Sequence, residues 1–139
     1  MALRQQTGFT LLELLIVLLI IGLLAAFVGP KYFAQIGKSQ TQVTKAQIEA
    51  FDKALDQYRL DLGKYPTTAQ GLDALFSAPL NEANWKGPYL KKSVPLDPWG
   101  NKYQFTSPGS QPGREYEIVS FGRDGKFGGS GEDADITSW

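Results

Sequence analysis

Apolar residues dominate the first part of the chain, and a mixed pattern follows. Residues 9–30 contain a single charged residue, Glu13. The run can cross a bilayer as a helix, since each residue adds about 1.5 Å and the hydrocarbon core is about 30 Å thick. We therefore expect a membrane-spanning helix over 9–30, preceded by a short polar segment, 1–8. A removable secretory signal and a simple membrane anchor are the general alternatives for such a segment.

The apolar positions become periodic further along. Over residues 31–62 large apolar side chains recur every three or four positions, which predicts the amphipathic half of one long helix: Ile48, Phe51, Leu55, Tyr58 and Leu62. Pro30 lacks an amide hydrogen and should kink or break the helix where the two halves meet. Gly63 predicts the end of the helix. We interpret the apolar stripe as core, without chemistry of its own.

Turn residues punctuate residues 63–139, which predicts a small globular head. Residues 68–77 fit a short helix with three inward side chains: Leu72, Leu75 and Phe76. Residues 102–106 and 115–120 alternate as strands do and should form an antiparallel hairpin, with room for a third short strand. A sheet packed on the helix stripe gives an α+β fold.

Composition excludes several kinds of function. The chain has 14 basic and 14 acidic residues and no basic stripe, so nucleic-acid binding has no electrostatic support. It contains no histidine and no cysteine, which removes the commonest general base, the commonest zinc ligand and any disulfide. No nucleophile–base pair is visible. We therefore expect a protein that is not an enzyme and has no catalytic residues.

Glu13 is the unusual residue of the apolar run. A carboxylate within a membrane-spanning segment is a functional hypothesis by default and needs a partner. If the chain were cut after Gly8, a new α-amine would appear on Phe9, one helical turn from Glu13. The amine could belong to the same chain or to a neighbouring copy. A tolerated charge near the lipid headgroups is the alternative.

The C-terminal region is rich in acids and glycines. Residues 124–135 contain four acids, four glycines and one lysine. Glycines let the backbone turn carbonyl oxygens inward, and carboxylates with carbonyls are the ligands that Ca²⁺ prefers. The segment lacks the pattern of an EF-hand loop. Composition alone leaves a calcium loop and a solvated acidic tail equally open.

The N-terminal pattern resembles the processing site of type IV pilins and type II secretion pseudopilins. The resemblance rests on a polar leader with Arg4 and on the sequence Gly8-Phe9-Thr10-Leu11-Leu12-Glu13. It implies that a prepilin peptidase cuts between Gly8 and Phe9 and N-methylates Phe9. It also implies assembly roles: Glu13 would pair with the Phe9 amine, and Pro30 would let the helix bend or locally melt as a filament packs.

The head resembles that of the major pseudopilins in particular, through three segments: Tyr65-Pro66-Thr67-Thr68, Pro95-Leu96-Asp97-Pro98-Trp99-Gly100 and Ser120-Phe121-Gly122-Arg123-Asp124-Gly125. In that family a C-terminal loop binds Ca²⁺, and the resemblance places this loop at 121–136. The implied ligands are carboxylates and two backbone carbonyls: Asp124, Asp133, Asp135, Phe121 and Ser130. Asp124 matches best, and the choice between Asp133 and Asp135 stays open.

The resemblance implies a function as well. The chain would sit in the inner membrane as a single-pass protein with its C-terminal head in the periplasm. It would polymerise with copies of itself into a helical pseudopilus that drives export of folded proteins across the outer membrane. Minor pseudopilins and an inner-membrane assembly platform would be its partners. A type IV pilin, a minor pseudopilin and a membrane-anchored calcium-dependent periplasmic enzyme are the alternatives.

Overall fold

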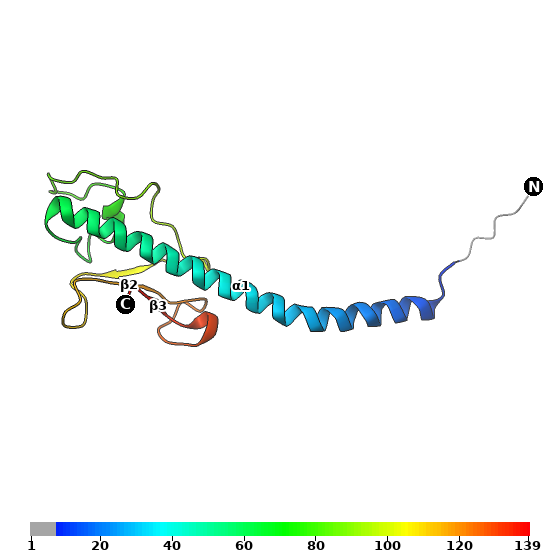
Figure 1. The fold of residues 1–139 in the computed structure, drawn as a ribbon. Coiled ribbons are helices and arrows are strands. Elements are labelled where there is room, and N and C mark those ends of the chain that lie inside the picture. The colour runs from blue at the N-terminus through cyan, green and yellow to red at the C-terminus, as the bar shows by residue number, and fades with distance from the viewer. Residues whose placement is uncertain (1–7) are drawn as a thin grey trace, which may run out of the picture. The chain divides into compact units, whose positions relative to one another are not determined.

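One long helix runs through both parts of the chain. The computed structural model describes residues 8–139 and divides the chain into an N-terminal unit, which ends at Ile36, and a head unit, Gly37–Trp139. Helix α1, Leu11–Leu62, extends through both (Figure 1). Apart from Gly8, the predicted leader lies outside the described residues.

Helix α1 continues through Pro30, so of the two predicted outcomes, a kink or a break, the break does not occur. A proline removes one backbone hydrogen bond, and the turns on either side can still continue the helix. The end of α1 is as predicted. Gly63 follows the helix with a φ of 75°, a left-handed conformation that glycine adopts without strain, and its N–H donates to the carbonyl of Arg59 at 2.7 Å.

The head core forms on the apolar stripe of α1. Four of the five predicted stripe residues are at most 3 % exposed: Ile48, Phe51, Leu55 and Tyr58. The fifth, Leu62, is partly buried and packs against the edge of this core. Leu72 and Leu75 of the short 3-10 helix η1, Leu72–Leu75, complete the core from one side. The sequence therefore identified the core face of the helix correctly.

A three-stranded antiparallel sheet covers another side of the same stripe. Its strands lie in the order β1 (Gln104–Thr106), β2 (Glu117–Ser120) and β3 (Ile136–Thr137). Phe105 of β1 is paired with Ile118 of β2, and both side chains are buried. Alternation along the strands turns these side chains toward the helix. The α+β fold, the hairpin and the third strand are confirmed.

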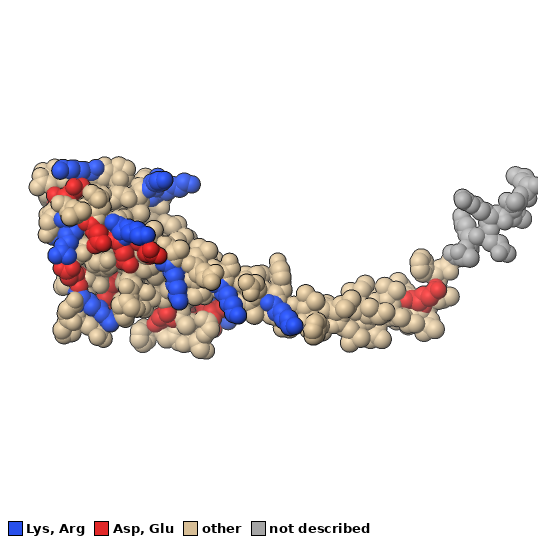
Figure 2. Space-filling model, in the orientation of Figure 1, with Lys and Arg blue, Asp and Glu red and all other residues tan. Residues whose placement is uncertain are grey.

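Three aspartates on α1 accept hydrogen bonds from three tyrosines of the head. In each pair the tyrosine hydroxyl donates to the carboxylate: Tyr116 to Asp52 at 3.0 Å, Tyr65 to Asp56 at 3.2 Å and Tyr89 to Asp61 at 2.9 Å. Burial raises the pKa of Asp52 above its usual range. These pairs fasten the loops and the sheet to the flanks of the helix, beside the apolar stripe. Figure 2 shows acidic and basic side chains mixed over the visible face of the head.

Two details of the head differ from the prediction. The helix predicted over 68–77 is limited to η1, because the turns on both sides are fixed by other contacts, such as the bond from Tyr89 N–H to the Leu75 carbonyl at 2.7 Å. Phe76 is 38 % exposed, so its predicted inward position is wrong. A 3-10 helix has three residues per turn, which turns the residue after Leu75 away from the core.

Leu55 and Leu60 make a matched pair for testing the core. Leu55→Ala should lower the free energy of unfolding of the head by about 3 kcal/mol, because it leaves a cavity at a fully buried position. Leu60 lies on the same helix but is 78 % exposed, and Leu60→Ala should change stability by about 0.5 kcal/mol or less. Urea unfolding of the full chain in detergent, followed by tryptophan fluorescence, measures both. Equal effects would contradict this assignment of the core.

Candidate functional site

The described part of the N-terminal unit exposes its apolar surface. Every large apolar side chain from Phe9 to Phe33 is at least 47 % exposed. This part of α1 is long and apolar enough to cross a membrane. Such a surface requires lipid or other helices around it, because water would impose a large hydrophobic cost. The first candidate site is therefore a helix surface rather than a pocket.

Glu13 takes part in the N-terminal cap of α1. Its Oε2 accepts a hydrogen bond from the Thr10 N–H at 2.8 Å, and the Thr10 hydroxyl oxygen accepts one from the Glu13 N–H at 3.2 Å. This reciprocal pair is a capping box, which satisfies two backbone donors that the first turn leaves unpaired. The sequence analysis missed it, although the Thr10-x-x-Glu13 spacing is its usual signal. Glu13 thus fixes the start of the helix.

The predicted calcium ligands lie on one loop of the head but have different partners. Asp133 is held by Arg123, with Nε to Oδ1 at 2.9 Å and Nη2 to Oδ2 at 3.1 Å. Asp124 is exposed, and its Oδ1 accepts a hydrogen bond from the Lys126 N–H at 3.1 Å. Within residues 8–139, no cluster of three or more acidic, histidine or cysteine side chains is positioned to hold a metal ion.

Asp135 has an unused ligand atom. Its Oδ2 accepts a hydrogen bond from the Gly128 N–H at 3.0 Å, whereas its Oδ1 is buried and has no hydrogen-bond partner. A buried carboxylate oxygen without a partner is costly, and a bound cation would relieve that cost. Asp135 also lines a cavity of about 460 Å³, together with Phe121 and Phe127. Of the predicted carboxylates, Asp135 is therefore the one whose surroundings best fit a hard cation.

The two predicted carbonyl ligands lie in different surroundings. Ser130 is exposed, and its carbonyl accepts the Asp133 N–H at 3.1 Å, at the start of the 3-10 helix η2, Gly131–Asp133. Phe121 is half-buried at the end of β2. Arg123 is the neighbour that the sequence analysis did not single out. Its hydrogen bonds to Asp133 raise its pKa further, so the guanidinium remains charged.

A buried aspartate joins the middle of the head to this loop. Asp97 is 4 % exposed, and its Oδ2 accepts the Ser120 hydroxyl at 2.7 Å. Its Oδ1 accepts the N–H groups of Trp99 and Asn101 at 3.1 and 2.8 Å. The Asn101 side-chain amide then donates to the Gly122 carbonyl at 2.9 Å. The turn therefore positions the first residues of the C-terminal loop, a role that the sequence showed only as a turn.

The other end of the loop contacts α1 at Gly37. Gly37 is buried, and a Cβ atom built there would lie 2.0 Å from Oε1 of Glu132. Glycine at this position leaves room for the Glu132 side chain against the helix, and a larger residue would displace that side chain. Glu132 also pairs with Arg123, Oε2 to Nη1 at 3.1 Å, so the loop and the beginning of the head helix share one contact network.

Comparison with known proteins decides the family. Residues 31–139 match the family described as type II secretion system protein G, and residues 3–29 match the prokaryotic N-terminal methylation motif. The chain belongs to the type II secretion system protein G family. The resemblance to pseudopilins noted in the sequence is thereby confirmed.

Individual members of the protein G family are similar over nearly the whole chain. The type II secretion system core protein G of Pseudomonas aeruginosa is 46 % identical over 98 % of this chain and 96 % of its own length. That of Vibrio cholerae is 45 % identical over 98 % and 93 %. The crystal structure of the major pseudopilin from the type 2 secretion system of enterohaemorrhagic Escherichia coli is 37 % identical, with a TM-score of 0.63, covering 77 % of this chain and 92 % of that one.

Asp97→Ala should lower the free energy of unfolding of the head by about 2–3 kcal/mol, since it leaves the buried Ser120 hydroxyl without its acceptor and removes two backbone bonds. Thermal unfolding of the full chain in detergent, followed by near-UV circular dichroism, measures the loss. Asp73→Ala is the control, because Asp73 is exposed and lies outside this network. A loss no greater than that of the control would show that the turn does not support the loop.

Proposed function

We propose that the protein is the structural subunit of the type II secretion pseudopilus, the filament that drives export of folded proteins across the outer membrane. The observation that carries the proposal is a membrane-length apolar helix that remains exposed, in a chain matched over its length by protein G relatives. A subunit of this kind acts by assembly and carries no catalytic site. Its head would lie in the periplasm and its helix in the inner membrane.

The apolar half of α1 supplies the reason to assemble. In the membrane, lipid covers its exposed side chains, and in a filament the same side chains would pack against the helices of neighbouring copies. Head-to-tail contacts between identical subunits that do not close into a ring generate helical filaments. Minor pseudopilins and the inner-membrane assembly platform are the partners that we expect at the ends of such a filament.

Processing would prepare the helix for this packing. A prepilin peptidase would cut between Gly8 and Phe9 and N-methylate Phe9. The cut would free an α-amine on Phe9, which places a positive charge beside the capping box of Thr10 and Glu13. In a neighbouring copy this amine could compensate the Glu13 carboxylate within the apolar core, where an unpaired charge is costly. Glu13 would therefore cap its own helix and set the register between subunits.

Calcium binding by the C-terminal loop is the second part of the proposal. Asp135, with its buried free oxygen, and the exposed Asp124 would hold Ca²⁺, with carbonyls such as those of Phe121 and Ser130 completing the shell. The ion would supply positive charge and six to eight oxygen bonds that draw the loop together. In a head without cysteine, a bound metal could replace the constraint that a disulfide gives other small domains.

Two substitutions separate the roles of Glu13. Glu13→Gln keeps a side chain that can cap the helix but removes the charge, and it should abolish filaments. Thr10→Ala removes the hydroxyl of the capping box but keeps the charge, and it should still give filaments. Electron microscopy of sheared filaments is the measurement, with mass spectrometry to confirm that both variants have lost residues 1–8 and carry the methyl group. Normal filaments from Glu13→Gln would rule out charge pairing.

Chelation tests the calcium loop. Adding EGTA to the full chain in detergent should lower the melting temperature of the head by about 5 °C, since a ligand that binds only the folded state stabilises it. Asp124→Asn and Asp135→Asn should each remove this response, and Asp73→Asn, outside the loop, should retain it. If both loop variants respond to EGTA as the unaltered chain does, the acidic segment is only a solvated tail.

A further inference from the structure

Arg123 ties the beginning of the C-terminal loop to its end. Its backbone N–H donates to the Glu132 carbonyl at 2.8 Å. Its guanidinium makes two parallel bonds to Asp133 and a third to Glu132, at distances of 2.9–3.1 Å. Paired hydrogen bonds between guanidinium and carboxylate fix orientation as well as charge. The Arg123 side chain therefore bridges the two acids of η2 from the opposite side of the loop.

Backbone contacts make this closed arrangement tight. Gly122 has a φ of 64°, and a Cβ atom built there would lie 2.6 Å from the carbonyl oxygen of Glu132. Gly129 has a φ of 89°, and a Cβ atom there would lie 2.4 Å from the carbonyl oxygen of Asp133. The two sides of the loop thus approach each other without intervening side chains. Glycine at both positions therefore lets the backbone of η2 lie close to the other side of the loop.

The guanidinium of Arg123 makes hydrogen bonds to the acids of one half of the loop and to none in the other half. Both oxygens of Asp133 are occupied by Arg123. In the other half, Asp135 Oδ1 is buried without a partner and Asp124 is exposed. A cation entering the loop would therefore find both oxygens of Asp133 already paired and one buried oxygen of Asp135 free.

We propose that Arg123 acts as a tethered cation, which keeps the η2 half of the loop closed when Ca²⁺ is absent. Calcium then orders only the half that contains Asp124 and Asp135, and the head stays folded in both states. The calcium part of this inference rests on the proposed function, whereas the closing role of Arg123 does not. If Arg123 acts in this way, removal of calcium loosens only part of the loop and does not open it completely.

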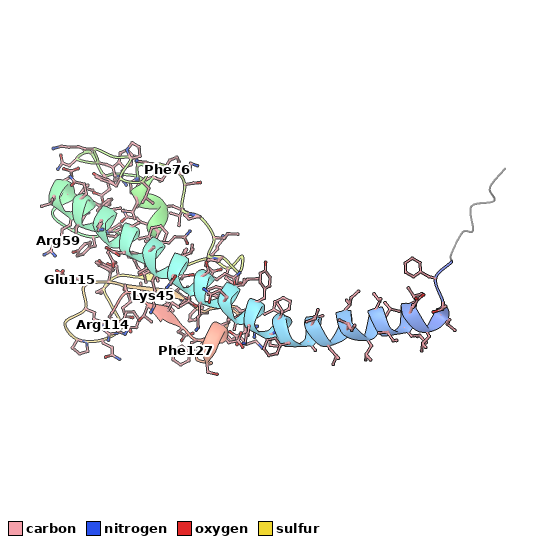
Figure 3. The ribbon with its side chains drawn as sticks, turned by 45° about the vertical axis from the view of Figure 1, so that its right-hand side comes forward. Lys45, Arg59, Phe76, Arg114, Glu115 and Phe127 are labelled. Carbon is pink, nitrogen blue, oxygen red and sulfur yellow. The ribbon has the colours of Figure 1, made fainter. Side chains whose placement is uncertain are left out.

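Proteolysis at Phe127 reports the state of the loop. Phe127 lies on the loop and is 91 % exposed (Figure 3), and chymotrypsin, which cuts after aromatic residues, has no need of Arg123. The full chain in detergent is digested in EGTA and in calcium chloride, and release of the peptide 128–139 is followed by mass spectrometry. Cleavage of this kind tracks the population of the locally open form when opening is fast.

Arg123→Gln should be cleaved about fivefold faster than the unaltered chain in EGTA, because the substitution removes an exposed but multiply bonded ion pair that closes the loop. Arg59→Gln is the matched control. Arg59 is also exposed and pairs with Glu115 at 2.6 Å, outside the loop, so its loss should leave cleavage at Phe127 unchanged (Figure 3). Equal rates for Arg123→Gln and the unaltered chain in EGTA would overturn the proposal.

A second variant covers the case in which Arg123→Gln does not fold. Asp133→Asn removes the same ion pair from the other side, and it should raise cleavage in EGTA by a similar factor. An unchanged rate for this variant would also overturn the role of Arg123. The effect of calcium on the unaltered chain is a separate result: if calcium leaves cleavage unchanged, the calcium proposal fails, and the comparison in EGTA still decides the closing role.

Discussion

Burial of one stripe of α1 is the constraint on which the head depends. The stripe from Ile48 to Tyr58 is almost completely removed from water, and the helix alone could not bury it. Segments from η1 and from all three strands contribute the side chains that cover it. The tyrosine–aspartate pairs lie beside the stripe and fix which loop covers which part of the helix. Hydrophobic burial thus stabilises the folded head, and the hydrogen bonds beside the stripe fix where each loop packs on the helix.

The same helix has an opposite requirement in its first half. There the apolar side chains surround the whole helix, so a single packed face could not bury them, and the described residues provide no cover. A helix that is apolar on every side is typical of a segment placed in lipid or among other helices. Helix α1 therefore contains two kinds of apolar surface. The stripe of its second half is buried by the head of the same chain, and the apolar surface of its first half requires lipid or other helices.

Local signals explain what could be predicted from the sequence. The stripe, the end of α1 at Gly63 and the hairpin depend on spacing within a few residues, and these predictions are confirmed. The predicted inward position of Phe76 was wrong because a 3-10 turn, fixed by distant contacts, replaces the expected α-helix. The Thr10–Glu13 cap also has a local signal, but the charge of Glu13 within the apolar run pointed to an amine partner and not to a cap.

Contacts between distant segments explain what could not be predicted at the candidate site. The bond between Asp97 and Ser120 depends on how a turn meets the sheet, and no spacing in the sequence specifies it. Counting acids identified the C-terminal loop, but it could not show that Asp133 is bound to Arg123 while Asp135 keeps a free oxygen. The acids of a loop are equivalent in composition, and only their neighbours distinguish them.

Gly37 has a consequence for how sequences of this family can change. Because the Glu132 side chain occupies the space where a Cβ would stand, a larger residue at 37 would either displace that side chain or favour a shorter one at 132. These two positions are far apart in the chain, yet their volumes are constrained together. Across related chains, substitutions at 37 and 132 should therefore covary, and their pairing would record the docking of the C-terminal loop against the helix.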